Sequence, residues 1–312
     1  MRPFFSICIP AFKNRDYLQI LLESIASQTF KDFEVIITDD SPTNELEALC
    51  HTFSNKFTVQ YIRNSPALGS PKNWNKAIAE ARGQWIKIMH DDDWFADKNA
   101  LAIFAETASL NEQADFIFSG YNQYEEGKLT RVQINSKRII RVMSKNPYVL
   151  FLKNYIGHPS TTLIKNDRKD WYDPQTKWVV DFEFYIRCIQ TGTMFYIPRT
   201  LVNIGINKDQ ITKQVFRNIE VEIPENIYLL NKLGDKNLNH IIVYDYYWRM
   251  FRNLKIRSIE EVTQYAKDQA ISPKLKSMLD FQLHFSLPIL RIGLFSKFLM
   301  TLSFLKNRRN KS

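Results

Sequence analysis

The sequence predicts an α/β protein in which a doubly wound, mainly parallel sheet is followed by a C-terminal helical extension. Between Phe4 and Tyr124, short apolar segments alternate with amphipathic helical segments. This order is typical of parallel sheets built with right-handed crossovers. From Lys213 onward only helical periodicity is evident. We therefore expect one domain over residues 1–212 and a helical region over residues 213–312.

The individual elements follow from periodicity and from turn-forming residues. Strands are expected at 4–9, 33–38, 58–63, 84–89, 115–124 and 193–198. Helices are expected at 15–28, 43–52, 70–82 (with Gly83 as its C-cap), 97–110, 146–155, 178–191, 214–233, 240–257, 259–269 and 274–304. The basic segment 128–144 is consistent with a loop or hairpin near the site, or with a solvated edge strand whose charges block aggregation.

The composition is that of a core-forming protein with a basic charge balance. The 312 residues are 45% apolar and carry a formal charge of +9, which favours anionic partners such as nucleotides, nucleic acid or anionic lipid. Three widely spaced cysteines, Cys8, Cys50 and Cys188, indicate a reduced, cytoplasmic compartment rather than a disulfide framework. The N-terminal segment lacks the features of a signal peptide, and no window has the roughly twenty apolar residues of a membrane span.

The most informative stretch is QWIKIMHDDDW at 84–94, where Asp91, Asp92 and Asp93 follow an apolar strand. Three adjacent like charges require a cation or solvent. The carboxyl edge of an open α/β sheet is where ligands bind, and Mg²⁺ or Mn²⁺ prefers carboxylates together with substrate phosphates. The motif by itself predicts either a metal–diphosphate site or a solvated acidic turn, with Asp97 available to cap the next helix.

Four separated motifs occur in a characteristic order: FSICIPAFKN at 5–14, IITDDSPT at 36–43, NSPALGSPKN at 64–73 and IKIMHDDDW at 86–94. Over residues 4–212 the chain thereby resembles the nucleotide-sugar domain of the inverting family-two glycosyltransferases, which have the fold called GT-A. The resemblance implies sugar transfer from a nucleotide-sugar, a UDP-hexose, with Mg²⁺ or Mn²⁺ as cofactor. It also implies a glycan or lipid-linked saccharide acceptor in bacterial polysaccharide synthesis (O-antigen or capsule), with no nucleic-acid partner.

The resemblance also assigns residues to the donor site. The donor-binding residues that it implies are Pro10, Ala11, Phe12, Asn14, Asp39, Asp40, Lys72, Asn73, Asp91 and Asp92. Asp93 is the expected metal ligand, with Asp91 as a second. His90 stands where the family has its first Asp, and is either a ligand or an ordinary hydrogen-bonding residue.

The general base is expected in VVDFEFYIRC at 179–188. By resemblance, Asp181 aligns with the catalytic Asp, although Val180 replaces the usual preceding Glu. The alternative is a carboxylate that simply stabilises the first turn of a helix. Arg187 is expected to pair with a carboxylate and orient this helix.

The last family element falls in LVNIGINKDQIT at 201–212. Asn207 stands near the family's His position and Gly205 near its Arg position. Asn207, Lys208 or Lys213 is therefore left to approach the leaving diphosphate. His158 is a further polar candidate on the acceptor side.

Two other classes of protein share features with this sequence. A metal-dependent nucleotidyltransferase requires a glycine-rich loop after the first strand, and PAFKNRD has none. A basic nucleic-acid-binding module fits the composition, but no signature of such a module is present.

The C-terminal segment 288–305 is apolar, is interrupted by Arg291 and Lys297, and precedes a basic tail. This pattern favours a helix in the interface of an anionic membrane, at the inner face of the cell membrane. The alternative is a helix that packs on the rest of the protein or forms a dimer.

Overall fold

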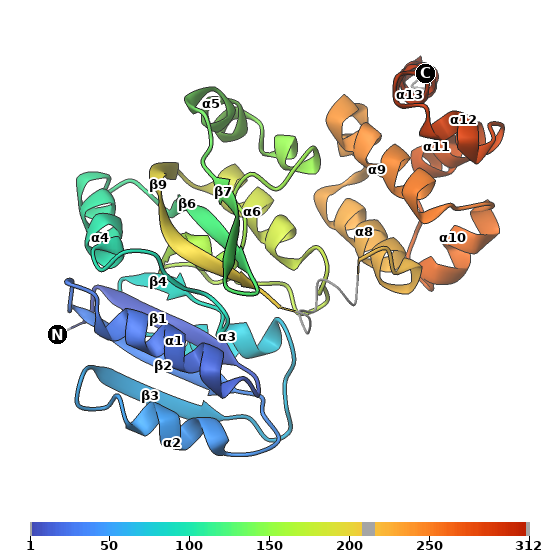
Figure 1. Ribbon diagram of the computed structural model, residues 1–312. Coiled ribbons are helices and arrows are strands. Elements are labelled where there is room, and N and C mark those ends of the chain that lie inside the picture. The colour runs from blue at the N-terminus through green and yellow to red at the C-terminus, as the bar shows by residue number, and fades with distance from the viewer. Residues whose placement is uncertain (1, 208–215, 310–312) are drawn as a thin grey trace. The chain divides into compact units, whose positions relative to one another are not determined.

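The computed structural model describes residues 2–207 and 216–309 (Figure 1). The chain forms two compact units. The first unit comprises residues 1–147, 154–174 and 180–208, and the second comprises 148–153, 175–179 and 209–312. Domains at 1–212 and 213–312 stay a prediction. The compact units differ from them because two short segments, 148–153 and 175–179, group with the C-terminal helices.

In the first unit, strands and helices alternate along the chain as expected. The strands are β1 (Phe5–Ala11), β2 (Phe33–Asp39), β3 (Thr58–Arg63), β4 (Trp85–Ile88), β5 (Trp94–Phe95), β6 (Phe116–Glu125), β7 (Lys128–Gln133), β8 (Thr162–Lys165) and β9 (Met194–Ile206). The helices are α1 (Arg15–Ala26), α2 (Glu45–His51), α3 (Lys72–Ala79), α4 (Ala100–Leu110), α5 (Lys137–Lys145) and α6 (Val180–Thr191), with short 3₁₀ turns η1 (Pro147–Phe151) and η2 (Pro159–Thr161).

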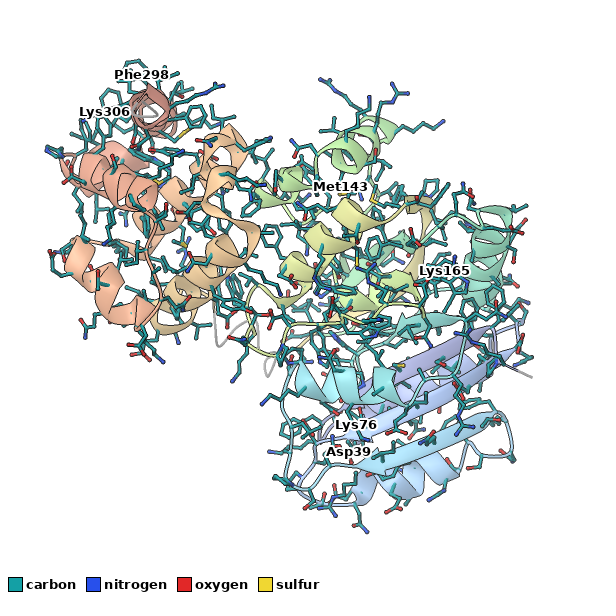
Figure 2. The ribbon with its side chains drawn as sticks, turned by 180° about the vertical axis from the view of Figure 1, so that it is seen from behind. Asp39, Lys76, Met143, Lys165, Phe298 and Lys306 are labelled. Carbon is teal, nitrogen blue, oxygen red and sulfur yellow. The ribbon has the colours of Figure 1, made fainter. Side chains whose placement is uncertain are left out.

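The described strands form one sheet in the order β3-β2-β1-β4-β8-β6-β9-β5, with β7 paired to β6. The strands β3, β2, β1 and β4 are parallel, and β6 is parallel to β9. The strand β8 runs antiparallel to both β4 and β6 and joins these two parallel groups. Helices α1 and α2 lie on one face and α3 on the other (Figures 1 and 2), which confirms the doubly wound, mainly parallel fold.

The core of the first unit explains why β1 and β2 read as almost continuously apolar. Every residue of β1 is buried, as is usual for a parallel strand covered by helices on both faces. From α1, the side chains of Leu18, Leu21, Leu22 and Ile25 recur at helical spacing and join this core.

Several elements differ from the sequence-based expectation. Segment 128–144 contains β7, whose residues are largely exposed, as expected for an edge strand, but also the unexpected helix α5. The strand β9 is much longer than the expected 193–198, and β8 was not expected, because both depend on pairing with β6. Residues 146–155 hold only the turn η1.

The second unit is helical. Its described elements are α8 (Ile219–Leu233), η3 (Asp235–Asn239), α9 (Ile241–Leu254), α10 (Ile259–Ala266), α11 (Pro273–Leu283), α12 (Leu287–Arg291) and α13 (Gly293–Arg309). The single helix expected over 274–304 is wrong: α11 ends at Leu283, and separate helices begin at Leu287 and Gly293. Pro288 in the first turn of α12 and Gly293 at the start of α13 suit these interruptions. Among the described residues, no helix is long and apolar enough to cross a membrane.

Glu225 of α8 holds the segment that precedes α6 in the sequence. Its carboxylate accepts hydrogen bonds from the backbone N–H groups of Lys177 (2.9 Å), Trp178 (2.7 Å) and Val179 (3.1 Å). One buried carboxylate thus satisfies three consecutive backbone donors, which explains why 175–179 groups with the C-terminal helices.

Gly83 lies in the tight connection between α3 and β4, and does not cap α3, which ends at Ala79 with Glu80 as its cap. A Cβ at this position would lie 2.4 Å from the backbone nitrogen of Ser6 in β1. The Ser6 hydroxyl accepts a hydrogen bond from the Gly83 N–H at 2.7 Å. The close approach of two backbones therefore requires glycine.

We predict that Gly83→Ala destabilises the protein by about 1–3 kcal/mol, because the added methyl group overpacks a contact between two backbones. Urea denaturation measures the change. Gly293→Ala is the matched control, since its Cβ would meet no atom within 4 Å. Equal stability of wild type and Gly83→Ala would contradict the steric argument.

Candidate active site at the carboxyl edge of the sheet

The sheet topology gathers the predicted site residues at one edge. The carboxyl ends of β1, β2 and β4 lie together because these strands are parallel. Phe12 follows β1, Asp40 follows β2, and the run from His90 to Asp93 follows β4. The end of β9 adds Gly205 and Asn207.

Each aspartate of the triplet has a separate partner from another strand end. Asp91 accepts a hydrogen bond through Oδ2 from the Phe12 N–H at 2.8 Å. Asp92 accepts one through Oδ2 from the Asn207 side-chain amide at 2.8 Å. Asp93 accepts one through Oδ1 from the Gly205 N–H at 3.1 Å. The triplet is therefore tied by hydrogen bonds to the ends of β1 and β9, with Asp93 buried and Asp91 and Asp92 partly exposed.

Burial and repulsion by Asp92 raise the pKa values of the Asp91 and Asp93 carboxyl groups. Burial, reinforced by the charge of Asp92, raises the pKa of Asp91 to about 8, although the Phe12 N–H opposes this. The pKa of Asp93 also lies well above its usual range, because its carboxylate is buried and Asp92 is close. A cation at the cluster would offset both effects.

A mixed group of His90, Asp92 and Asp93 has the arrangement of a metal-ion site. One ligand atom from each lies within 4.8 Å of the others. His90 Nε2 and Asp93 Oδ2 are buried and lack a hydrogen-bond partner among the described residues. Burial, with a smaller effect of the neighbouring His158 and Lys87, lowers the pKa of His90 to about 3, so its imidazole is neutral and able to coordinate. Asp91, the second ligand expected from sequence, lies outside this group.

Lys87 is a buried cation beneath the cluster that the sequence analysis did not single out. Its Nζ donates to the carbonyl oxygens of Ser160 and, at 3.3 Å, of Ile88. The Ser160 hydroxyl in turn accepts the His90 N–H at 2.9 Å. Burial lowers the pKa of Lys87 to about 7, although the charge of Asp93 opposes this. A lysine inside the apolar strand WIKI is the sequence signal that could have identified it.

Asp39, Asp40 and Asn73, expected to bind the donor, fix the loops around the site. Asp39 accepts hydrogen bonds from the Ser41 N–H (2.7 Å) and the Tyr61 hydroxyl (2.6 Å). Asp40 accepts the N–H groups of Leu68 (2.9 Å) and Gly69 (2.7 Å). The amide of Asn73 donates to the Thr38 carbonyl at 3.0 Å. These contacts preorganise the loop 64–71, and direct donor contacts stay a prediction.

The remaining predicted donor residues lie at the same edge. Pro10 and Ala11 are buried at the end of β1, whereas the Phe12 side chain is 51% exposed, with Lys13 Nζ 4.7 Å from the centre of its ring. Asn14 caps α1, since its Oδ1 accepts the Tyr17 N–H at 3.2 Å. Lys72 begins α3 and is exposed. Their donor contacts also stay predictions.

Asp181 lies in the first turn of α6. Its Oδ1 accepts the Phe182 N–H at 2.8 Å, and Oδ2 lies 3.5 Å from the Asn154 side-chain amide. Burial raises the pKa of Asp181 to about 6, although the Phe182 N–H opposes this. The carboxylate is thus tuned towards the range in which a group accepts a proton near neutral pH.

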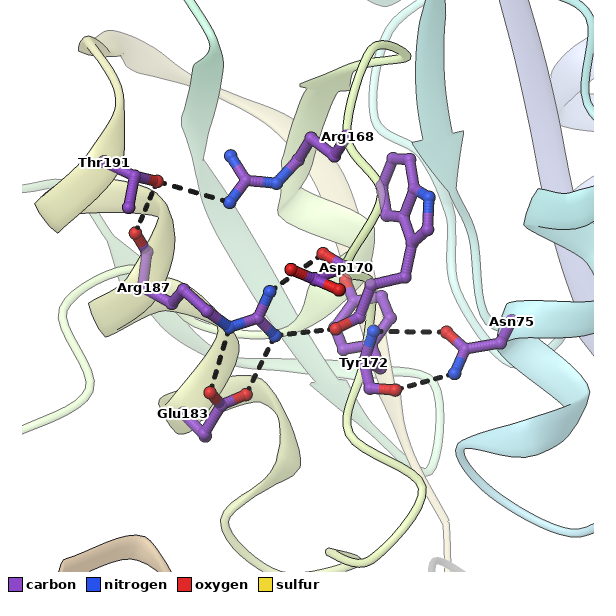
Figure 3. A network of polar contacts seen from close by, with 8 residues as sticks. Asn75, Arg168, Asp170, Tyr172, Glu183, Arg187 and Thr191 are labelled. Atoms are coloured by element: carbon purple, nitrogen blue, oxygen red, sulfur yellow. Dashed lines mark hydrogen bonds and ion pairs between the residues drawn. The ribbon is translucent and has the colours of Figure 1, made fainter. Parts of the chain in front are cut away.

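A network of polar contacts orients α6 (Figure 3). As expected, Arg187 pairs with a carboxylate: its Nε and Nη2 lie 3.0 Å from the two Glu183 oxygens. Arg187 also donates to the carbonyls of Asp170 (2.8 Å) and Trp171 (2.6 Å), while Asn75 of α3 donates to the Tyr172 carbonyl at 2.6 Å. The segment 170–172 is therefore held between α6 and α3.

Aromatic contacts connect the two halves of the site. The ring of Trp74 lies 4.7 Å from the ring of His90 and 5.1 Å from that of Tyr172. Burial raises the pKa of the Tyr172 hydroxyl, and the charge of Asp181 adds to this rise.

His158 is neutral, because burial lowers its pKa to about 4. Lys208 and Lys213 lie outside the described residues.

This chain belongs to glycosyl transferase family 2, whose sequence profile matches residues 6–173. Its relatives include an uncharacterised glycosyltransferase of Methanocaldococcus jannaschii, 28% identical over 80% of this chain and 86% of that protein. The abequosyltransferase of Salmonella typhimurium is 36% identical over 35% of this chain and 33% of its own. The chondroitin synthase of Pasteurella multocida is 22% identical over 81% of this chain but only 25% of the synthase. The chain is therefore an enzyme that transfers glycosyl groups. The family match does not favour the two alternatives, a nucleotidyltransferase or a nucleic-acid-binding module.

Solved structures confirm the GT-A fold. A structure of S. aureus TarS in complex with UDP superimposes with a TM-score of 0.59 at 20% identity, over 98% of this chain and 89% of that one. A mannosyltransferase from Pyrobaculum calidifontis, in complex with GDP-Man and Mn²⁺, has a TM-score of 0.56 at 11% identity, over 100% and 89% of the two chains.

We predict that Lys87→Met raises the hydrogen-exchange rate of the His90 backbone amide at least about tenfold, because Ser160 loses its hydrogen bond from Lys87 and the segment opens more readily. Replacement of a buried charge by an apolar side chain of similar size is often neutral or favourable for stability. Global unfolding is therefore expected to change little. Amide hydrogen exchange and urea denaturation measure the two effects. Lys76→Met, which removes a surface pair with Glu80, is the control. Unchanged His90 protection would show that Lys87 does not position the site.

Proposed function

We propose that this glycosyltransferase moves a hexose from a UDP-sugar to a saccharide hydroxyl with inversion, and that a divalent cation is required. The observation that carries the proposal is the group of His90, Asp92 and Asp93 at the carboxyl edge of β4. The complexes of TarS with UDP and with UDP-GlcNAc support a nucleotide-sugar donor. In this proposal the exposed side chain of Phe12 would contact the base, and Lys72 would contact the diphosphate.

His90, Asp92 and Asp93 would hold the cation. The fit rests on two buried ligand atoms that lack partners among the described residues, His90 Nε2 and Asp93 Oδ2. One imidazole and two carboxylates suit Mn²⁺ better than Mg²⁺, which prefers oxygen ligands throughout. When bound, such a cation supplies neutralisation of the charge on the leaving diphosphate.

Asp181 is the general base in this proposal. Its carboxylate takes the proton from the acceptor hydroxyl, and the acceptor oxygen attacks the anomeric carbon from the face opposite the nucleotide. The bond between this carbon and the β-phosphate oxygen breaks, and its electron pair leaves with UDP. A single displacement converts an α-linked donor to a β-linked product. Asn154, near Asp181 Oδ2, orients the carboxylate.

The acceptor is proposed to be a growing polysaccharide or a lipid-linked saccharide. The relationships to an abequosyltransferase and to a chondroitin synthase support a saccharide acceptor. A lipid-linked acceptor is consistent with peripheral contact between the second unit and an anionic membrane. The exposed apolar residues of α12 and α13 support this contact.

We predict that Asp181→Asn lowers kcat about a hundredfold or more, because the amide cannot accept the hydroxyl proton. UDP affinity should stay near that of wild type. In the wild type, kcat/KM should fall about tenfold per pH unit below pH 6, since protonation of Asp181 inactivates the base. Product formation followed by mass spectrometry tests both. Asp170→Asn, which alters an exposed carboxylate, is the control. Turnover of Asp181→Asn within about tenfold of wild type would remove Asp181 from this role.

We predict that Asp93→Ala abolishes the strengthening of UDP binding by Mn²⁺, because the cation loses a buried carboxylate ligand. Calorimetry with UDP, with and without Mn²⁺, measures the effect. Asp91→Asn should keep the Mn²⁺ response, since Asp91 bonds to the Phe12 N–H instead. If Asp91→Asn lost the response and Asp93→Ala kept it, the metal would be held by the other carboxylate.

A further inference from the structure

A basic pocket lies within the second unit. It has a volume of about 360 Å³ and is lined by Arg217, Arg252, Asn253, Lys255 and Arg291. Arg252 and Asn253 belong to the last turn of α9, Lys255 caps that helix, and Arg291 ends α12. Among the described residues, no carboxylate lines the pocket. Four cations therefore converge on one cavity.

The guanidinium of Arg252 is held in the pocket by neutral partners. It donates to the Ser296 hydroxyl at 3.3 Å and to the Asn253 side-chain oxygen at 3.1 and 3.2 Å. Arg249, one turn earlier, is instead paired with Asp245 at 2.8 Å. Partial burial and the charge of Arg249 lower the pKa of Arg252. An anion in the pocket would offset the mutual repulsion of its four cations.

The wall of the pocket continues into an exposed apolar surface. Ile292, which follows Arg291, is 58% exposed, and Leu294 is 87% exposed. Along α13, further exposed apolar residues recur at intervals of three and four positions: Phe295, Phe298, Leu302 and Leu305. This spacing places them on one helical face. Phe298 and Lys306, labelled in Figure 2, belong to this helix.

We propose that the pocket formed by Arg217, Arg252, Lys255 and Arg291 binds the phosphate of an anionic lipid headgroup, while the apolar face of α12 and α13 inserts into the lipid interface. The adjacency of the two features favours a lipid over a soluble phosphate. A soluble anion would fill the pocket without covering the apolar face, whereas an anionic bilayer complements both. This inference rests on the membrane contact proposed above, but not on the chemistry of sugar transfer.

The test is cosedimentation of the full-length protein with phosphatidylcholine vesicles, with and without phosphatidic acid. Wild type should bind only the anionic vesicles. Arg252→Gln/Arg291→Gln should weaken this binding about twenty-five-fold, since each basic side chain at an anionic surface contributes about fivefold. Lys236→Gln/Lys276→Gln removes the same charge from exposed positions of the second unit outside the pocket and should change binding by less than about twofold. Urea denaturation checks that each variant is folded. The single variant Arg291→Gln leaves the Arg252–Ser296 contact intact, and its affinity for anionic vesicles should fall about fivefold.

Three results would overturn the proposal. Equal losses in the pocket and control variants would indicate diffuse attraction instead of a site. Failure of wild type to bind anionic vesicles at low salt would remove the lipid altogether. Calorimetric binding of inorganic pyrophosphate that depends on Arg252 and Arg291, without vesicle binding, would assign the pocket to a soluble phosphate compound. Hydrolysis of UDP-sugars without vesicles is measured in parallel and should be equal in all variants, so that failure of the donor chemistry is seen separately.

Discussion

Three adjacent carboxylates at the end of β4 are the constraint on which the first unit depends. Their repulsion is offset by donors from other strand ends: the Phe12 N–H after β1, the Gly205 N–H in β9 and the amide of Asn207. These contacts exist only if β1 and β9 end at the same edge as β4. The approach is so close that a Cβ on Gly205 would lie 2.2 Å from the Asp92 carbonyl oxygen. The acidic cluster is therefore stable only when these strands are aligned at one edge, and its hydrogen bonds in turn hold the strand ends together.

A second layer of buried polar groups supports the cluster. Lys87 places a cation beneath carboxylates that are costly to bury, and through Ser160 it also fixes the backbone at His90. Such a residue conflicts with the apolar pattern of β4 and contributes little net stability. Local conflicts of this kind are typical of functional sites, where preorganisation of ligands outweighs the cost in folding free energy.

The second unit meets a different demand. Helix α13 buries Leu299, Met300 and Phe304 on one face and exposes apolar side chains on another. A helix that is apolar on two faces has more apolar surface than its own unit can cover. No carboxylate among the described residues lines the neighbouring pocket, although four cations do. An anionic surface with an apolar interior would explain both features, because it would cover the exposed apolar side chains of α13 and neutralise the cations of the pocket.

The sequence by itself determined the alternation of β1 to β4 with α1 to α3, and the run of carboxylates that follows β4. Apolar periodicity and runs of carboxylates are local properties, so β3 was predicted at its observed bounds and β1 and β2 within two residues. The ordered motifs also identified the enzyme family. Only the tertiary structure decided the length of β9, the presence of β8 and the division of 274–304 into three helices. It alone grouped His90 with Asp92 and Asp93, gave Asp40 its role in holding the loop 64–71, and revealed Lys87 as a support. Strand pairing, desolvation and the partner of a buried polar group depend on residues far apart in the chain, and no local pattern specifies them.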